Sequence, residues 1–365
     1  MNAQIKFTFF LLIFIIAQSK AQVLKPGFDK MEYNELMLIS ARTTNDEKYY
    51  TNFAKPTNYE MIYQSKPIGL DNLWDLWTNN KNTCAISIRG TTEKQESWLS
   101  NFYAAMVPAK GILKIENNNV FNYQLADDSK AAVHVGWLLS MAYLANEIIP
   151  KIKEQHQKGI KDFLIIGHSQ GGAFAYLLTS HLMHLQKINE LPIDVRFKTY
   201  CSAAPKPGNL YYAYEYEAAT QGGWAYNVVN AADWVPEMPV SIQTLNDFNN
   251  VNPFTNAKAL IKKQKFPNNI VLKHVYNKLN KPTKKAQKNY EKYLGTMTSK
   301  IIKKYVPSFT PPKYYKSSHY VRTGATIVLM PDSAYFKQYP NDATKLFPHH
   351  FHNQYLFLLK LLVPN

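Results

Sequence analysis

The chain has 365 residues, of which 46% are hydrophobic and 19% are charged. This composition supports a large buried core and excludes a disordered or fibrous protein. The 42 Lys and Arg residues outnumber the 26 Asp and Glu residues, for a formal charge of +16, but the excess is local. Residues 245–322 hold 17 Lys or Arg and two acidic residues, a net charge of +15 that leaves +1 for the rest. A basic nucleic-acid-binding domain therefore does not describe the whole chain.

The first 21 residues have the pattern of a secretory signal. Lys6 precedes an apolar run over residues 7–17, and Ser19-Lys20-Ala21 forms a small-x-small cleavage site. The run is shorter than the roughly 20 apolar residues that span a bilayer, which disfavours the alternative of an uncleaved anchor. We expect residues 1–21 to be removed and residues 22–365 to form a secreted or periplasmic domain.

Short apolar segments alternate with amphipathic segments from residue 22 to about residue 242. The pattern predicts strands over residues 83–88, 163–166, 196–203 and 225–230, and helices over residues 136–152 and 172–185. Strands separated by helices of this length predict an α/β fold, with a mostly parallel sheet covered by helices on both faces.

The basic segment, residues 245–322, interrupts this alternation. Apolar residues recur at helical spacing over residues 286–305 and most lysines lie off that stripe, which predicts an amphipathic basic helix. A last strand is expected over residues 324–330 and a last helix over residues 353–362. The basic segment would be a cap or lid-like insert that meets anionic lipid, or alternatively a solvated outer face of the domain.

Gly167-His168-Ser169-Gln170-Gly171 lies between a predicted strand and a predicted helix. Small residues at both ends permit a sharp turn that presents the serine, and the helix N-terminus favours developing negative charge. A serine nucleophile needs a base and an acid that orients it, in the chain order Ser, acid, His. Asp233 follows the strand over residues 225–230 and is the candidate acid. Spacing alone does not choose among three candidate bases before the last helix: His349, His350 and His352.

Four further segments extend this pattern: Ile88-Arg89-Gly90-Thr91 with Trp98, Val133-His134-Val135-Gly136-Trp137, Pro205-Lys206-Pro207-Gly208-Asn209, and Val229-Asn230-Ala231-Ala232-Asp233-Trp234-Val235-Pro236. With the serine turn, they resemble the class 3 lipases, an α/β-hydrolase family, over roughly residues 26–239.

The resemblance implies a role for each matched residue. Ser169 would be the nucleophile, Asp233 the acid, and the backbone N–H groups of Thr91 and Gln170 the oxyanion hole. The family often places an aromatic residue five positions after its histidine, and some members place one three positions after it. Tyr355 stands at these distances from His350 and His352, so the resemblance favours His350 and keeps His352 as the alternative.

The resemblance implies a serine carboxylic-ester hydrolase that acts on acylglycerol or phospholipid esters, without a metal or an organic cofactor. The alternatives are a short-chain or polysaccharide-ester esterase, a serine peptidase and a non-catalytic exported lipid-binding protein. The export signal disfavours nucleic acid as a partner. In the implied fold, Cys84 and Cys201 lie on the two strands that flank the serine-bearing strand, roughly 9 to 10 Å apart. A disulfide needs Cα atoms within about 7 Å, so we expect two free thiols.

Overall fold

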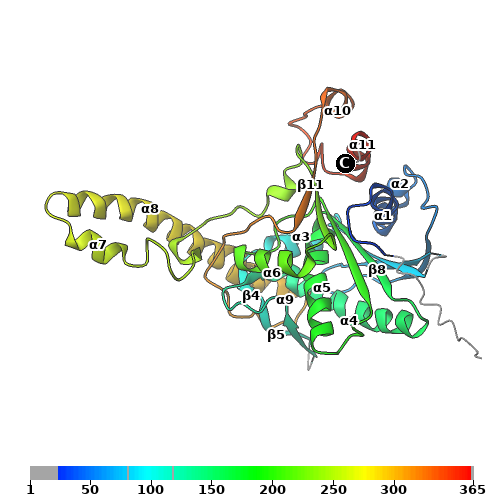
Figure 1. The fold of residues 1–365 in the computed structure, drawn as a ribbon, viewed down its shortest axis with the longest axis horizontal. Helices are drawn as coiled ribbons and strands as arrows, with labels where there is room; N and C mark the ends of the chain where they lie inside the picture. The colour runs from blue at the N-terminus through cyan, green and yellow to red at the C-terminus, as the bar shows by residue number, and fades with distance from the viewer. Residues whose placement is uncertain (1–23, 80–81, 117–118, 363–365) are drawn as a thin grey trace, which may run out of the picture.

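The structure is a computed structural model that describes residues 24–79, 82–116 and 119–362. The predicted secretory signal lies outside the described residues. The framework is a seven-stranded sheet in the order β1-β2-β3-β8-β9-β10-β11 (Figure 1). Strands β3 and β8 to β11 pair in parallel, whereas β1 and β2 add an antiparallel edge. The strand bounds are β1 Glu60–Gln64, β2 Trp74–Thr78, β3 Thr83–Ile88, β8 Asp162–His168, β9 Arg196–Ser202, β10 Ala225–Asn230 and β11 Ala325–Leu329.

Helices cover both faces of this sheet. Helices α1 (Lys30–Thr43) and α11 (His352–Leu361) pack against each other over one face, and α4 (Val135–Gln157) and α5 (Gln170–Lys187) cover the other face. Strand β8 is buried along its whole length, and its successive side chains pack alternately into the two cores on either side of the sheet. Ile165 belongs to the core under α4 and α5, while Leu164 and Ile166 belong to the core under α1. This two-sided burial explains the unbroken apolar run in its sequence.

The predicted α/β fold with a mostly parallel sheet is confirmed. The predicted strand over residues 83–88 is β3, and the other predicted strands differ from β8, β9, β10 and β11 by two residues or fewer at either end. Cys84 on β3 and Cys201 on β9 are buried free thiols, as predicted, with β8 between their strands.

Smaller elements complete the body. Two small antiparallel sheets pair β4 (Met106–Pro108) with β7 (Ala132–His134) and β5 (Lys110–Glu116) with β6 (Asn119–Gln124). The shorter helices are α2 (Glu47–Tyr50), α3 (Gln95–Phe102), α6 (Leu210–Thr220) and α10 (Ser333–Gln338), with 3-10 turns at Val235–Glu237 and Leu245–Asp247. Among the described residues, no helix is both long enough and apolar enough to cross a membrane.

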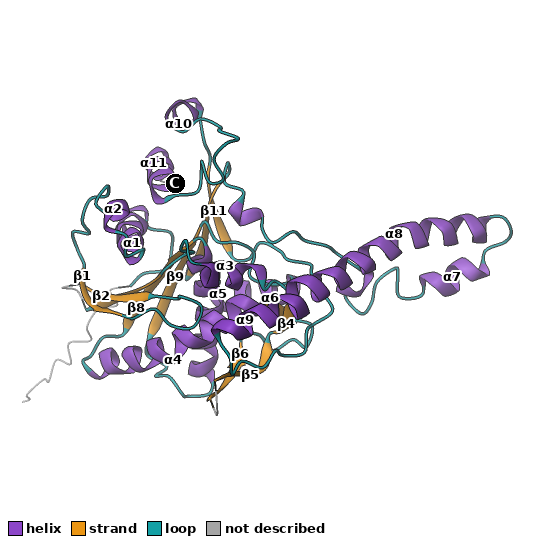
Figure 2. Ribbon diagram, turned by 180° about the vertical axis from the view of Figure 1, so that it is seen from behind, coloured by secondary structure: helices purple, strands orange, loops and turns teal. Residues whose placement is uncertain are grey.

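The basic segment between β10 and β11 is helical. Helix α7 (Ala257–Lys263) packs against α8 (Asn268–Glu291), and the pair projects far from the body (Figures 1 and 2). A π-helical turn, Lys292–Met297, then leads into α9 (Thr298–Tyr305), which packs on α3.

The stretch predicted as an amphipathic helix, residues 286–305, is helical throughout, but it is not one regular α-helix. That stretch contains the end of α8, the π-helical turn and α9. A Cβ added at Gly295 in the turn would meet Ala105 and Tyr314 at 2.9 Å, so the helix approaches the body closely at this point. Ile302 on α9 is fully buried. The predicted apolar stripe is therefore buried at Ile302, whereas Tyr293, Met297, Ile301 and Tyr305 remain exposed.

Candidate active site

The serine turn joins β8 to α5. Ser169 lies between the two elements with φ 60° and ψ −129°, a left-handed conformation that costs a non-glycine residue about 1 to 3 kcal/mol. Glycine is required on either side because there is no room for a Cβ. A Cβ at Gly167 would overlap the carbonyl of Gly171, and a Cβ at Gly171 would overlap the carbonyl of Ile88 on β3. Close packing of three backbone segments therefore forces the serine out of the regular strand and helix.

Asp233 lies in the loop after β10, and its carboxylate is buried. Its Oδ2 lies 2.7 Å from Nδ1 of His350 and accepts a hydrogen bond from the hydroxyl of Tyr355 at 2.8 Å. Its Oδ1 accepts the backbone N–H of Val235 at 3.0 Å. A carboxylate in this position favours the imidazole tautomer with a proton on Nδ1, which leaves Nε2 free to accept a proton.

The two other candidate histidines bind elsewhere. The ring of His349 contacts the Tyr335 hydroxyl at 3.0 Å and Oδ1 of Asn341 at 2.9 Å. The ring of His352 contacts the Tyr49 hydroxyl at 2.8 Å and Ser40 Oγ at 3.0 Å. Both nitrogens of each ring are therefore occupied by groups other than Asp233.

His168, the residue before Ser169, ties the serine turn to the loop of His350. Its Nε2 donates to the backbone carbonyl of His350 at 2.8 Å, and its Nδ1 accepts from the Ser202 hydroxyl at 3.0 Å. The His168 ring also lies 4.3 Å from the His352 ring. Burial lowers the pKa of His168 well below its ordinary value and that of His352 to about 3, so both rings are neutral at pH 7.

The two predicted oxyanion-hole residues are joined through α3. Gln170 is the first residue of α5, so its backbone N–H has no partner within the helix. Its side-chain amide donates to the Ser97 carbonyl at 3.0 Å and to Asn101 Oδ1 at 2.9 Å. The Asn101 amide in turn donates to Thr91 Oγ1 at 3.0 Å. Asn101 has no motif signal in the sequence, because its partners come together only in the folded chain.

Residues 85–242 match the sequence profile of the family described as lipase (class 3). Over this stretch, which is less than half of the chain, the sequence is similar to the class 3 lipases. The similarity supports a carboxylic-ester hydrolase. No curated protein gives a significant match to this chain.

Several solved lipases are similar to this protein in structure. A triacylglycerol lipase from Penicillium expansum is 18% identical, with 58% of this chain and 75% of that chain covered and a TM-score of 0.43. A lipase from Yarrowia lipolytica is 19% identical, with 60% and 79% covered and a TM-score of 0.42. Lipase II from Rhizopus niveus is 20% identical, with 57% and 74% covered and a TM-score of 0.40.

Aromatic rings lie close to His350. The Phe347 ring lies 5.5 Å from the His350 ring and stacks on Trp234 at 5.3 Å. Trp98 on α3 lies 6.3 Å from Phe347 and stacks on Phe102, which is 54% exposed. The rings come from α3, from the loop after Asp233 and from the histidine loop, so an apolar rim borders the histidine.

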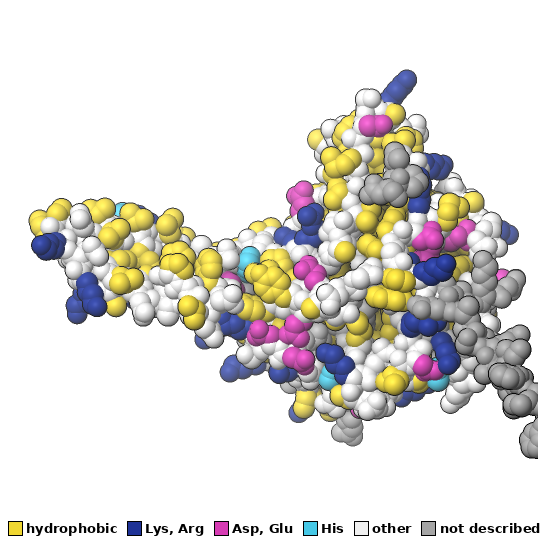
Figure 3. All heavy atoms as spheres, viewed as in Figure 1, with side chains coloured by type: hydrophobic (Ala, Val, Ile, Leu, Met, Phe, Trp, Pro, Cys, Tyr) yellow, Lys and Arg dark blue, Asp and Glu magenta, His cyan; other side chains and the backbone are white. Residues whose placement is uncertain are grey.

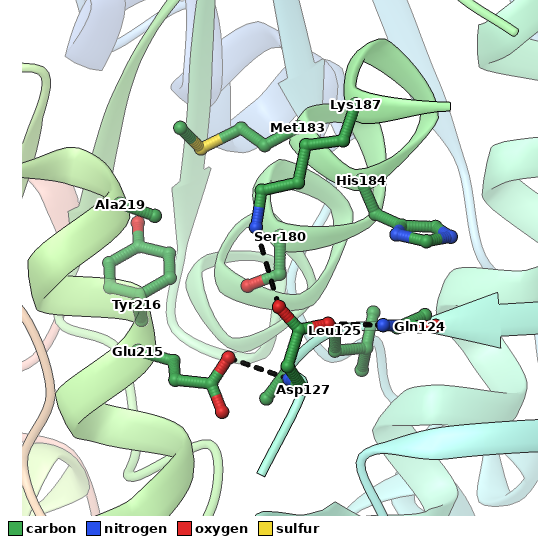
Figure 4. Close-up of a pocket in the computed structure, with 11 residues that line it drawn as sticks. Gln124, Leu125, Asp127, Ser180, Met183, His184, Lys187, Glu215, Tyr216 and Ala219 are labelled. Carbon is green, nitrogen blue, oxygen red and sulfur yellow. Dashed lines mark hydrogen bonds and ion pairs between the residues drawn. The ribbon is translucent and has the colours of Figure 1, made fainter. Parts of the chain in front are cut away.

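A separate surface hollow lies between the end of β6, α5 and α6 (Figure 4). Its polar groups bind the adjacent loop: Glu215 accepts the backbone N–H groups of Asp127 and Asp128, and Lys187 lies 3.7 Å from Asp127 (Figure 4). None of its lining residues belongs to the candidate site. The part of the chain that the structure describes contains no cluster of His, Cys, Asp or Glu that could hold a metal ion.

Proposed function

We propose that this protein is a secreted class 3 lipase, a serine hydrolase that cleaves acylglycerol or phospholipid esters with the triad Ser169, His350 and Asp233. The observation that carries the proposal is the 2.7 Å contact between Nδ1 of His350 and the buried Asp233 carboxylate. The histidine loop is in turn bonded to His168, the neighbour of Ser169 on the strained turn. Export rests on the signal pattern of residues 1–21, with cleavage after Ala21.

In this reaction, the Ser169 hydroxyl attacks the ester carbonyl while Nε2 of His350 accepts its proton. The imidazolium, stabilised by Asp233, then gives the proton to the departing alcohol oxygen and leaves an acyl-serine. Water attacks the acyl group, His350 accepts a proton from the water, and the proton returns to the serine as the acid is released. The backbone N–H groups of Thr91 and Gln170 would bind the oxyanion, each contributing about 3 to 4 kcal/mol to transition-state stabilisation.

The apolar rim supports a lipid ester as the substrate. Phe102 and Phe351 are 54% and 44% exposed, and Trp234 is 37% exposed, close to the proposed base. Rings in this position offer apolar contact to an acyl chain, and such contact is most favourable for long chains because it scales with buried area. We therefore expect the enzyme to prefer long acyl groups to acetate.

The test is hydrolysis of p-nitrophenyl esters from acetate to palmitate by residues 22–365, beside Ser169→Ala. The variant is expected to lose activity by about 1000-fold or more, because the nucleophile is removed. Ser129→Ala, which removes an exposed hydroxyl from the loop after β6, is the matched control and should retain activity. Wild-type rates equal to those of Ser169→Ala at every chain length would contradict the proposal.

A further inference from the structure

The arm, defined as residues 252–289, carries an exposed apolar surface that no part of the described chain covers. Helices α7 and α8 pack against each other and project from the body, and Figure 3 shows apolar side chains along the visible face. Phe266 in the turn between the helices is 78% exposed, and Leu279 on α8 is 69% exposed. The other large exposed apolar side chains of the arm are Phe254, Leu260, Ile270, Val271, Leu272 and Val275. An exposed apolar surface of this extent, bordered by polar residues, is typical of an interaction site.

The exposed apolar side chains of α8 share one face. Val271, Val275 and Leu279 follow each other at intervals of four residues, so they form a stripe along the helix. Lys278 and Lys285 lie seven and fourteen residues after Val271, which is about two and four helical turns along α8. Both lysines therefore border the stripe on the same side of the helix. From residue 248 to residue 290 the sequence has ten lysines and no acidic residue. The arm therefore presents apolar area and positive charge together.

We propose that the arm binds the surface of an anionic lipid bilayer, with Phe266 and the α8 stripe inserted among the lipids. Anionic headgroups complement the lysines, and the acyl region of the bilayer accepts the apolar stripe. A soluble polyanion such as nucleic acid would satisfy the lysines alone and leave the stripe in water. The inference rests on the proposed function, since it makes the bilayer surface the place where the enzyme meets its ester.

The root of the arm is bonded to the chain segment that follows Asp233. The Tyr290 hydroxyl, at the end of α8, donates to the carbonyl of Val240, seven residues after Asp233, at 2.8 Å. Helix α8 continues through the π-helical turn into α9, and the Tyr305 hydroxyl at its end donates to Gln95 of α3 at 2.9 Å. A continuous helical path therefore links the lipid-binding stripe to the helix that holds Thr91 and Gln170, so docking of the arm sets the orientation of the site.

The test is flotation of residues 22–365 with vesicles of phosphatidylcholine alone or with about 30% phosphatidylglycerol. The protein carries Ser169→Ala, so that no lipid is hydrolysed during the measurement. We expect binding to the anionic vesicles to be about tenfold tighter than to neutral vesicles, and to weaken strongly in high salt because charge attraction is screened.

Two arm variants separate the contributions. Val275→Ser with Leu279→Ser removes apolar area, and Lys278→Gln with Lys285→Gln removes charge; all four side chains are exposed. Each pair is expected to weaken binding to anionic vesicles by about fivefold or more. The matched controls are Ile188→Ser with Ile193→Ser, and Lys66→Gln with Lys153→Gln, which make the same changes at exposed positions on the body. The controls should bind like the parent protein.

Three results would overturn the inference: absence of vesicle binding, arm variants that bind like their controls, and loss of binding in the lysine pair without loss in the apolar pair. The last result would mean that the arm is held at the vesicle surface by charge alone, without insertion of the apolar stripe. Hydrolysis of p-nitrophenyl butyrate by the same variants with Ser169 intact distinguishes this failure from failure of the proposed function. If butyrate is hydrolysed and vesicles are not bound, the inference alone fails; if no ester is hydrolysed, the proposed function fails.

Discussion

The Asp233 carboxylate binds three donors: the His350 ring, the Tyr355 hydroxyl and the backbone N–H of Val235. Hydrogen bonds to an ionised acceptor are short and strong, and together they leave the carboxylate little freedom to rotate. Because the orientation of the carboxylate fixes that of the imidazole, the tyrosine acts on the proposed base through the acid. We assign Tyr355 as a positioning residue for the proposed reaction.

Tyr355→Phe keeps the buried ring and removes its hydrogen bond to Asp233. We expect kcat for p-nitrophenyl butyrate to fall about 3- to 10-fold with KM unchanged, because the base is less well oriented while the acyl contacts remain. Tyr335→Phe, whose hydroxyl contacts Asn230 and His349, is the control and should change kcat by less than about twofold. A rise in KM at constant kcat would assign Tyr355 to substrate binding instead.

The choice of base is tested by comparing glutamine substitutions. His350→Gln should lower kcat/KM by about 1000-fold or more, because no group remains to accept the serine proton. His349→Gln removes a ring that contacts Tyr335 and Asn341 and should retain activity within about threefold. Steady-state rates on p-nitrophenyl butyrate decide between them. Comparable losses in both variants would contradict the assignment to His350.

The buried neutral histidines make stability depend on pH. Burial lowers the pKa of His134 and of His352 to about 3, whereas an unfolded histidine titrates near 6.5. The unfolded chain therefore binds protons that the folded chain does not, and stability present above about pH 6.5 is lost as pH falls toward 3. For each such histidine, the free energy of unfolding decreases by up to about 1.4 kcal/mol per pH unit in this range.

Urea unfolding at pH 7, 6 and 5 checks this dependence. The unfolding free energy of wild type should decrease as the pH is lowered from 6.5. In His352→Gln this decrease per pH unit should be smaller by the amount expected for one proton, whatever the stability of the variant at pH 7. His156→Gln, at a partly exposed ring beside Asp194, is the control for a general effect of histidine removal. Parallel slopes in wild type and His352→Gln would show that His352 titrates normally in the fold.

At the scale of elements, the serine turn depends on α3 as well as on its own glycines. Asn101 on α3 accepts hydrogen bonds from Gln170 Nε2 and Trp137 Nε1, and its amide donates to Thr91. One side chain therefore connects the loop after β3, the start of α5 and the start of α4. This connection fixes the distance between the two proposed oxyanion donors.

Asn101→Ala leaves the buried Gln170 amide and the Trp137 Nε1 group each without this acceptor. We expect a loss of about 2 to 4 kcal/mol in the free energy of unfolding. A fall of about tenfold in kcat should accompany it, because the oxyanion donors lose their alignment. Urea unfolding and p-nitrophenyl butyrate kinetics measure the two effects. Asn256→Ala, at an exposed asparagine before α7, is the control. An unchanged kcat in Asn101→Ala would show that the contacts of α3 do not align the oxyanion donors.

Over the whole molecule, the sequence predicts those features that short-range patterns encode. The apolar runs of β3 and β8 and the glycines around Ser169 identify the sheet and the turn, because burial and steric limits act on those residues directly. Periodicity over residues 286–305 reports an apolar stripe but not what covers it, so it misses both the π-helical turn and the packing on α3. Spacing could not separate His350 from its neighbours, since the separating contacts with Asp233, Asn341 and Ser40 join distant parts of the chain.

The arm should be dispensable for folding. Its buried residues, Asn280 and Gln287, are polar, and none of its side chains belongs to a hydrophobic core of the described structure. Replacing residues 256–282 by a short Gly/Ser linker keeps Tyr290 and α9 in place. We expect the melting temperature to change by less than about 4 °C.

Hydrolysis of p-nitrophenyl butyrate should stay within about twofold of wild type, because a soluble ester needs no lipid surface. Differential scanning calorimetry and steady-state kinetics check both outcomes on the same preparation, with wild type as the reference. Since the arm contributes exposed rather than buried apolar area, hydrophobic stabilisation gives no reason for the body to require it. A broad, non-cooperative transition in the shortened protein would mean instead that the arm is part of the folding unit.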